Sequence, residues 1–585
     1  MASQPTAPSR QYDLIAVDTE TTGLNPETHS LLGFSIAWRD SNGSLQSKYV
    51  PVGHRQSLFE KNVEWDEAVS MLQRVKAGAK TLVFHTAPFD IRFLRTLDPT
   101  FDVEDFIDVS TLAHMLGLDA EVEGRLSRSL LNLYDAHFTM SKEMRNKLKG
   151  LKKERVHLAD RFPSEVDEYA RLDAVMTLQL AERLNHLADI VDKGPLWDIE
   201  REFERLLIIL HRRGIRVDQK MVQQAIDQFE HLATTISESL QREGLENISN
   251  NVQVASFLYD TMGLVCPRHT PSGARSVDRK SLLSLSGTWQ ARKILEWRQY
   301  KKALATWLVP MLGDVQRDPL GRVHPQWKVA STRSSRISCE NPNIQQIPLS
   351  DREHLVYSSL KGIFTAPEGF QLVSWDYKQA DLRLATILAH EDTMADAFRE
   401  GRDPYVEMAN MIWGKCDADL RFKAKRFSLA TMYAMGARTA ANTFDIPYKE
   451  AKAILSTHRR VFPRYVHATK SATQRAERLG HVELWTGRSL KIALFEPSHK
   501  AFAWSVQGGV AEMVKRAMLR IEELTVGKGL RSRQLGQIHD SVVLEVADEE
   551  REDLLPRIKE LMEKDILPQE FQDYCPMQVD VSAWG

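Results

Sequence analysis

The segment YDLIAVDTETTGL near the start of the chain constrains the fold strongly, because it sets two carboxylates at the end of an apolar strand. Apolar and β-branched residues run up to Val17, and a turn signal follows at residues 23–26. Asp18 and Glu20 are two residues apart, so their side chains leave the strand on the same face. A solvated strand face would explain an isolated pair of acids. The pair therefore indicates a site only if other acids accompany it.

Two further segments supply such acids. The stretch TLVFHTAPFDIRFL contains an apolar strand over residues 81–85, breaks at Pro88 and leads into a helix from about Asp90. In EYARLDAVMTLQLAERL the apolar residues recur at helical spacing, which places Tyr169 and Asp173 one turn apart on one face. Asp173 has apolar neighbours, and a carboxylate in such surroundings indicates a metal or a buried partner.

In order and spacing, VDTET, HTAPFD and YARLD resemble the three motifs of the 3′→5′ proofreading exonuclease domain that many polymerases share. The resemblance implies an RNase H-like fold in which two divalent ions are held by Asp18, Glu20, Asp90 and Asp173, while Tyr169 helps to orient the attacking water. Mg²⁺ prefers carboxylate oxygens, and two ions stabilise both oxygens of phosphodiester hydrolysis. Because all four acids are present, we expect an active exonuclease. Thr86 replaces the family's usual Asn and changes one substrate contact.

Composition limits the remaining possibilities. A chain of 585 residues is too long for one hydrophobic core, so roughly three or four folded units are expected. The net charge is −2, so any nucleic-acid binding must come from a local basic groove. The four cysteines are widely separated and predict neither disulfides nor a zinc site. No stretch resembles a signal peptide or a membrane span.

The middle of the chain predicts helices. IEREFERLLIILHRRGIRVD has helical apolar spacing and ends at Gly214, as a helix C-terminus often does. The downstream segments NISNNVQVASFLYDTMGL and TPSGARSVDRKSLLSL resemble the thumb of a family A DNA polymerase, the bacterial polymerase I type. The helix ARKILEWRQYKKAL carries Arg292, Lys293, Arg298, Lys301 and Lys302, which either follow DNA phosphates or are merely solvated.

The polar segment TRSSRISCENPNIQQIP would be only a loop by its pattern, but it resembles closely the family's TGRLSSxxPNLQNIP. The resemblance implies that Arg336 contacts the primer and the incoming base pair. It also places Thr332, Asn343 and Gln345 on DNA-contacting positions.

FQLVSWDYKQADLRLATILAHE predicts a strand ending at Asp376 and a helix from about Gln379, where the helix N-terminus favours phosphate. It resembles the family's motif DYSQIELR. The resemblance implies that Asp376 and Tyr377 belong to a metal site and that Gln379 and Asp381 line the nucleotide pocket. Asp381 replaces the glutamate that walls off the sugar 2′ position, which bears on ribonucleotide exclusion.

RFKAKRFSLATMYAMGA sets Arg421, Lys425, Leu429 and Tyr433 at four-residue steps, spanning ~18 Å along one helix face. Two cations at one end can grip phosphates, while an apolar and an aromatic group meet sugar and base. The segment resembles the family's RxxxKxxxFxxxYG and implies a dNTP-binding helix. Leu429 and Ala434 depart from that pattern and bear on sugar selectivity.

Two C-terminal segments complete the set. AFAWSVQGGVAEMVKRAML resembles a family helix on which Gln507 contacts the template. LGQIHDSVVLEV reads as a hairpin that holds Asp540 at its tip, with His539 beside it as a DNA contact, and it resembles the motif VHDELVFEV. Ser541 replaces the second acid of that motif. Asp376 and Asp540 are therefore the expected catalytic carboxylates of this site, with Tyr169 as the catalytic tyrosine of the exonuclease.

The predicted fold is multidomain, with α/β and α+β units: an RNase H-like exonuclease domain followed by a right-hand polymerase with thumb, palm and fingers. The expected parts are a disordered N-terminus (1–10), the exonuclease domain (11–195), connecting helices and thumb (196–330), the first part of the palm (331–390), the fingers (391–505) and the second part of the palm (506–585).

The expected function is template-directed addition of dNTPs to a primer 3′-hydroxyl, with 3′→5′ proofreading and two Mg²⁺ ions per site, or Mn²⁺ as an alternative. Primer–template DNA and dNTPs are the expected partners, with replisome proteins or a processivity factor beyond them. A cytoplasmic monomer is expected, from a bacterial cell or a phage-infected host. A start directly at the exonuclease, without a 5′ nuclease, favours phage. The alternatives are an exonuclease with a degenerate, DNA-gripping polymerase half, and a non-enzymatic scaffold on primer–template DNA.

Overall fold

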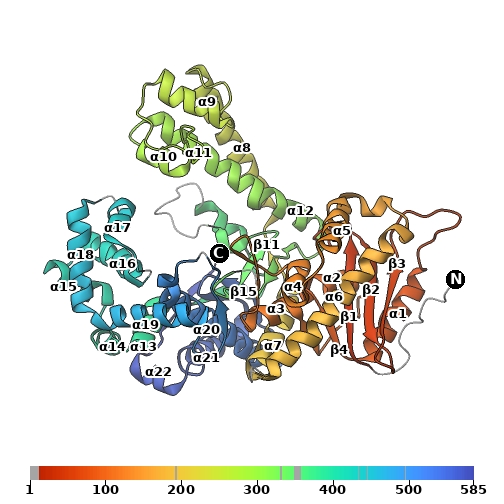
Figure 1. The fold of residues 1–585 in the computed structure, drawn as a ribbon. Helices are drawn as coiled ribbons and strands as arrows, with labels where there is room; N and C mark the ends of the chain where they lie inside the picture. Colours follow the sequence, from red (N-terminus) through yellow and green to blue (C-terminus); the bar gives the residue numbers. More distant parts are fainter. Residues whose placement is uncertain are drawn as a thin grey trace.

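The structure is a computed structural model that describes residues 12–190, 194–329, 332–347, 358–432, 434–444, 446–494 and 496–584. The N-terminus predicted over residues 1–10 lies outside the described residues, as do Tyr433 and the side chain of Leu429. Figure 1 shows an N-terminal sheet domain on one side, a helical group on the other and a pair of long helices rising between them. None of the helices in the described ranges has both the length and the apolar character needed to cross a membrane.

The N-terminal domain is built on a five-stranded sheet in the order β3-β2-β1-β4-β5. β1 (Tyr12–Thr21) runs antiparallel to β2 (Leu31–Arg39) and parallel to β4 (Ala79–Phe84). β3 (Leu45–Pro51) and β5 (Phe106–Asp108) form the edges. Both strands predicted from the sequence, at residues 12–17 and 81–85, are confirmed.

Helices cover both faces of this sheet, because alternate side chains of its strands are apolar on both sides. Ala16 and Val83 pack in one core with residues of α3 (Val109–Met115), α4 (Leu130–Phe138) and α6 (Pro163–Ile190). Ile15 and Val17 pack in another with residues of α1 (Trp65–Gly78) and α2 (Ala87–Leu97). Successive side chains of β1 therefore reach opposite layers of helices.

Small elements complete this domain: the hairpin β6 (Ala120–Val122) and β7 (Arg125–Ser127), and α5 (Lys142–Lys153). From it α7 (Gly194–Arg213) leads into the second half of the chain, as the sequence predicts. α7 packs against α2 and α3 of the first domain and against α20 (Ala501–Val526) and β15 (Arg533–Ile538) of the second. One helix thus joins the cores of both halves.

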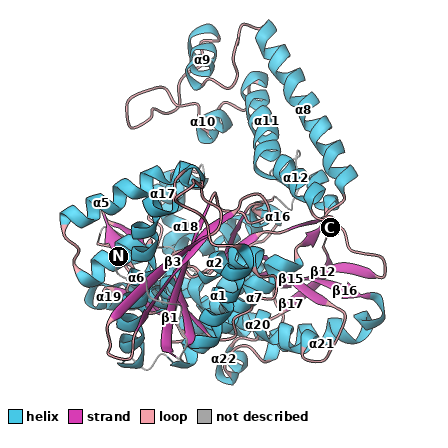
Figure 2. Cartoon of the chain, turned by 90° about the vertical axis from the view of Figure 1, so that its right-hand side faces the viewer, coloured by secondary structure: helices cyan, strands magenta, loops and turns pink. Residues whose placement is uncertain are grey.

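The second half centres on a four-stranded sheet in the order β15-β16-β12-β17 (Figure 2). β12 (Phe370–Tyr377) lies between β16 (Ser541–Ala547) and β17 (Val579–Ala583), antiparallel to both. The helices packed around it are α13 (Ala380–Ala389), α20, α21 (Arg551–Lys564) and α22 (Gln569–Tyr574). The strand and the hairpin predicted around Asp376 and Asp540 are confirmed. α20 crosses the position at which the sequence predicts the fingers to end and the palm to resume.

Two helical regions flank this sheet (Figure 1). The region predicted as the thumb pairs α8 (Gln219–Arg242) with α11 (Trp289–Ala303) and carries α9 (Asn251–Ser256) and α10 (Arg279–Ser284) towards its tip, with α12 (Val309–Arg317) at its base. The region predicted as the fingers contains α14 (Asp392–Arg399), α15 (Pro404–Trp413), α16 (Ala418–Met432), α17 (Ala437–Phe444), α18 (Tyr448–Val461) and α19 (Pro463–Leu479).

Short strand pairs link these regions. β8 (Ile215–Arg216) pairs with β9 (Arg322–Val323). β10 (Gln326–Lys328) pairs with β11 (Ser338–Glu340), which lies inside the polar segment that begins at Thr332 and that its pattern alone predicted to be a loop. β13 (His481–Glu483) and β14 (Ser489–Lys491) form a hairpin before α20.

Candidate active sites

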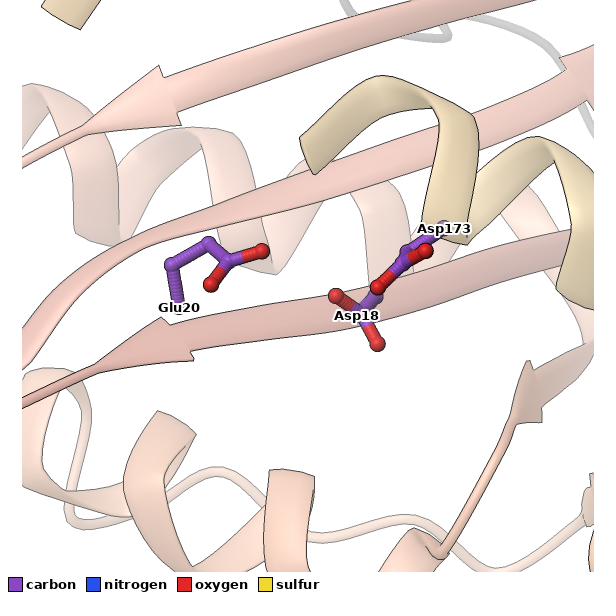
Figure 3. A group of neighbouring side chains, drawn as sticks. All are labelled: Asp18, Glu20 and Asp173. Carbon is purple, nitrogen blue, oxygen red and sulfur yellow. The ribbon is translucent and has the colours of Figure 1, made fainter. Parts of the chain in front are cut away.

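Three of the predicted exonuclease acids form one group. Asp18 and Glu20 extend from β1, and Asp173 extends from α6, which lies over the same face of the sheet (Figure 3). One carboxylate oxygen from each lies within 4.8 Å of the others. Glu20 and Asp173 are buried, whereas Asp18 is partly open to solvent. A partly open group of three carboxylates suits a hard divalent cation that retains some of its water.

Tyr169 lies one helical turn before Asp173, as predicted. Its hydroxyl donates a hydrogen bond to Asp173 Oδ2 at 2.9 Å, and its ring is buried. This contact fixes the phenol beside the acid group.

Asp90 lies outside this group of three. It belongs to α2, in the layer that covers the opposite face of the sheet. Asp90 Oδ1 accepts hydrogen bonds from the backbone nitrogen of Thr19 at 3.1 Å and from its hydroxyl at 2.6 Å. Thr19 stands between Asp18 and Glu20 in sequence, so its side chain leaves β1 on the other side. Asp90 is thereby tied to the strand that carries the other two acids.

Burial, reinforced by the charge of Asp108, raises the pKa of Asp90 to about 7 against the hydrogen bonds from Thr19. Asp108 is a further buried acid that the motifs in the sequence did not indicate. Its carboxylate accepts hydrogen bonds from the backbone nitrogens of Ala87 and Ser110, so it fixes the starts of α2 and α3. The signal for it was an acid between the apolar strand FI and a helix, which is typical of an N-cap.

Asp376 and Asp540 meet at the ends of paired strands. Asp376 lies opposite Ser541 in the register of β12 and β16, and the backbone nitrogen of Tyr377 donates to the carbonyl of Asp540 at 3.5 Å. Desolvation raises the pKa of Asp540, an effect that Arg336 opposes and the charge of Asp376 reinforces. Such mutual repulsion between neighbouring carboxylates is relieved by a bound cation.

A third carboxylate that sequence analysis missed lies beside this pair. Asp580 on β17 stands opposite Asp376 in the sheet, and the pKa of Asp376 is raised by desolvation and by the charge of Asp580. Lys378 Nζ pairs with Asp580 Oδ1 at 2.8 Å. The one local sign of Asp580 in the sequence was an acid within the apolar terminal strand VDVSA. Asp580 lies beside Asp376 because of the order of the strands in the sheet.

Two hydroxyls of the expected site turn into the protein. Tyr377 is buried, and its hydroxyl donates to the carbonyl of Met562 at 3.0 Å. Ser541 donates to the carbonyl of Ile538 at 2.7 Å. Tyr377, predicted among the metal-site residues, can therefore reach a cation only through its backbone carbonyl.

Arg336 lies close to the acids of β12–α13 and the hairpin tip. Its Nη2 is 3.3 Å from one oxygen of Asp381 and 3.8 Å from Asp540 Oδ1. Thr332 donates its hydroxyl to the backbone carbonyl of Arg336 at 2.8 Å. The predicted primer-contacting segment thus borders the candidate metal site.

Gln379 precedes the first residue of α13 and has φ 47°, a left-handed conformation. The change in backbone direction at this residue separates β12 from the helix.

The other predicted DNA contacts lie around this site. Gln345 Nε2 donates to Gln537 Oε1 at 2.7 Å, which adds Gln537 to the residues that sequence analysis missed. Asn343 accepts at its carbonyl from Trp307 Nε1 at 2.9 Å. Gln507 lies on α20, and His539 is exposed at the tip between β15 and β16 with φ 55°.

α16 carries the predicted phosphate-binding cations. Arg421 Nε donates to Asp403 Oδ2 at 2.7 Å, and its guanidinium lies 5.7 Å from the ring centroid of Tyr405. Lys425, one turn further, is exposed. Arg421 is thus held by α15 in this structure, while Lys425 extends into solvent.

Two of the five cations predicted on α11 have protein partners. Arg298 donates to the carbonyl of Val277 and to Asn251 at 2.8 Å, so it links α11 to neighbouring segments. Lys293 pairs with Glu296 at 2.7 Å on the same helix. The phosphate-tracking role of Arg292, Lys293, Arg298, Lys301 and Lys302 stays a prediction.

Comparison with known proteins matches both halves of the chain to protein families. Residues 217–584 match the model of DNA polymerase family A, and residues 7–189 match the model of a 3′-5′ exonuclease. DNA polymerase I of Rhizobium leguminosarum is 27% identical over 99% of this chain and 59% of its own length. DNA polymerase I of Pseudomonas aeruginosa is 27% identical over 94% and 61%. The chain thus spans less than two thirds of the length of these relatives.

A solved structure, described as the POL domain of Pol1 from M. smegmatis in complex with DNA primer-template and dNTP, has a TM-score of 0.77 at 20% sequence identity. It aligns with 98% of this chain and 95% of that one. Together with the two family matches, this likeness confirms the predicted fold, an exonuclease domain followed by a right-hand polymerase. Since the polymerase family model matches more than half of the chain, the protein belongs to DNA polymerase family A.

Proposed function

We propose that this chain extends a primer 3′ end with dNTPs under the direction of a DNA template, and removes nucleotides from the same end in a separate exonuclease site. The observation that carries the proposal is the meeting of Asp376 and Asp540 at paired strand ends, with Arg336 beside them. A second group of acids stands on the sheet of the N-terminal domain. Membership of the polymerase family supports the assignment of the two groups to synthesis and proofreading.

The donor sets of both sites fit divalent cations. Asp18, Glu20 and Asp173 offer carboxylate oxygens, the ligands that Mg²⁺ and Mn²⁺ prefer. At the other site Asp376 and Asp540 would hold Mg²⁺, with water and triphosphate oxygens as the remaining ligands. When bound, two such ions per site neutralise the charge that develops on the attacking and leaving oxygens.

Side chains of the fingers and palm bind and orient the substrates. Arg421 and Lys425 neutralise the triphosphate, and Arg421 exchanges Asp403 for phosphate oxygens as it does so. Arg336 holds the primer end, and Asp381 borders the sugar. Movement of α16 towards the palm over a correct base pair would select substrates by induced fit.

In the exonuclease site, Tyr169 positions Asp173 through its hydrogen bond and Thr19 fixes Asp90 against β1. The expected partners are primer–template DNA and dNTPs, with further replication proteins as candidates. The chain is proposed to work as a monomer in the cytoplasm.

A primer with a 5′ label tests both activities in one assay with Mg²⁺. Asp540→Ala should abolish extension in the presence of dNTPs and leave 3′ degradation intact, whereas Asp18→Ala should do the reverse. Asp548→Ala and Asp13→Ala are matched controls, because both acids are exposed at the far ends of the same strands. Loss of both activities in either site variant would contradict two independent sites.

The second candidate function is an exonuclease whose polymerase half only grips DNA. It is favoured by Ser541 beside Asp540 at the hairpin tip, because this position offers a cation no carboxylate and its hydroxyl donates to the carbonyl of Ile538. Degradation without any extension by the wild-type chain would establish it in place of our proposal.

A further inference from the structure

We infer that His114 of the exonuclease domain is a positioning residue for polymerisation: its hydrogen bond to Ser335 holds the backbone next to the primer-contacting Arg336. This inference rests on the proposed function. It assigns the N-terminal domain a role in synthesis that is separate from its own acid group.

The bond crosses between the two halves of the chain. His114, near the end of α3, lies with Nε2 3.0 Å from the hydroxyl oxygen of Ser335. Both side chains are buried, at 2% and 0% exposure. Because both groups are buried, the loss of one partner leaves the facing polar atom of the other, the Ser335 hydroxyl or His114 Nε2, without this hydrogen bond.

A network on the exonuclease side holds the His114 ring in place. Arg128 Nη1 lies 2.8 Å from His114 Nδ1 and 3.0 Å from Asp119 Oδ1. The two carboxylate oxygens of Asp119 also lie 3.3 and 3.2 Å from His114 Nδ1. Burial lowers the pKa of His114, although Asp119 opposes the shift. Arg128 and Asp119 thus hold Nδ1, and Nε2 faces Ser335.

Ser335 needs such support because of its backbone. Its φ is 57°, in the left-handed region that residues other than glycine rarely adopt. The next residue is Arg336, whose guanidinium faces Asp381 and Asp540. A change in φ at Ser335 would rotate the chain immediately before Arg336 and move its guanidinium away from these acids.

The surrounding contacts make this junction stiff. Lys491 Nζ donates to the carbonyl of Asp119 at 2.6 Å, and Arg333 donates to the carbonyl of Lys491 at 2.6 Å. The guanidinium of Arg333 also lies 4.2 Å from the ring centroid of Trp504 on α20. The hairpin β13–β14 is thus fixed both to the exonuclease domain and to the segment of Arg336.

A double-mutant cycle in the full chain tests the inference. His114→Ala should raise the KM for primer–template about tenfold, as expected when a buried hydrogen bond and its positioning effect are lost. His114→Gln keeps a side chain that can donate or accept a hydrogen bond, so it should recover most of this loss. Ser335→Gly removes both the hydroxyl and the cost of positive φ, so adding His114→Ala to Ser335→Gly should change KM less than twofold.

Two readouts separate positioning from general damage. Degradation of single-stranded DNA should be unchanged in all variants, since His114 lies outside the acid group of that site. The free energy of unfolding, measured by guanidinium titration of the same four proteins, should show the same coupling between His114 and Ser335. The inference is overturned if His114→Ala raises KM by the same factor in the wild-type chain and in the Ser335→Gly variant, or if it changes KM in neither. If the wild type extends no primer, the proposed function fails. If the unfolding titration shows no coupling between His114 and Ser335, the hydrogen bond between them is overturned.

Discussion

Replacing Glu200 by glutamine should destabilise the junction between the two halves of the chain. Glu200 on α7 pairs with Arg488 and, at 3.0 Å, with Lys515 on α20. Arg488 also donates to Glu512 at 2.7 Å. All four side chains have no exposed area, so two anions and two cations balance inside the protein. Although burial alone would raise it, Arg488 and Lys515 hold the pKa of Glu512 at about 2.

The expected loss follows from that balance. Glu200→Gln leaves two buried cations facing one carboxylate, and breaking a buried pair by removing one partner costs about 3–5 kcal/mol. Glutamine keeps the volume and one acceptor, so we expect the lower end, about 3 kcal/mol. The double change Glu200→Gln with Lys515→Met restores neutrality and should cost well under the sum of the two single changes.

Guanidinium unfolding followed by tryptophan fluorescence measures the loss. Glu202→Gln is the matched control, because Glu202 is exposed on the same helix and should shift stability by less than about 0.5 kcal/mol. If Glu200→Gln and Glu202→Gln unfold alike, or if the double variant shows simple additivity, the four groups do not act as a balanced network.

Three further outcomes are expected. His458 is buried next to Phe462 and Tyr465, and burial with the charge of Arg459 lowers its pKa to about 4. Because this folded-state pKa lies below the ordinary value of about 6.5, the contribution of neutral His458 to the free energy of unfolding is complete above about pH 6.5. The free energy of unfolding should then fall by about 3 kcal/mol as the pH drops towards 4. His458→Phe should flatten that dependence in pH-resolved unfolding, and an unchanged slope would contradict the buried neutral state. Arg421→Ala should raise the KM for dNTP at least about tenfold, as expected for the loss of a charge-assisted contact. Arg426→Ala is the control, because the guanidinium of Arg426 lies 4.5 Å from the ring centroid of Phe444, and it should leave that KM within twofold. Equal effects of the two substitutions would show that Arg421 does not bind the triphosphate. Asp381→Glu should increase the preference for dNTP over the ribonucleotide in competitive extension, because the longer side chain reaches further over the sugar, and an unchanged ratio would mean that Asp381 does not border the 2′ position.

The local sequence pattern was enough to predict the relative positions of site residues that lie within one strand or one helix. The alternation of β1 placed Asp18 and Glu20 on one face, and the four-residue step of α6 placed Tyr169 beside Asp173. Both spacings are properties of the backbone, so they hold whatever packs around them. The same reasoning found the strand before Asp376 and the hairpin of Asp540.

Contacts between distant segments were decided only by the tertiary structure. Thr19 and Asp90 are 71 positions apart, His114 and Ser335 are 221, and Glu200 and Arg488 are 288. Each pair meets because of strand order or helix packing, which no spacing within one segment encodes. Sequence alone indicated the acids of the two candidate sites other than Asp580. The tertiary structure decided that Asp90 approaches from the opposite face of the sheet, that Asp580 lies beside Asp376, and that the exonuclease domain supports the backbone before Arg336.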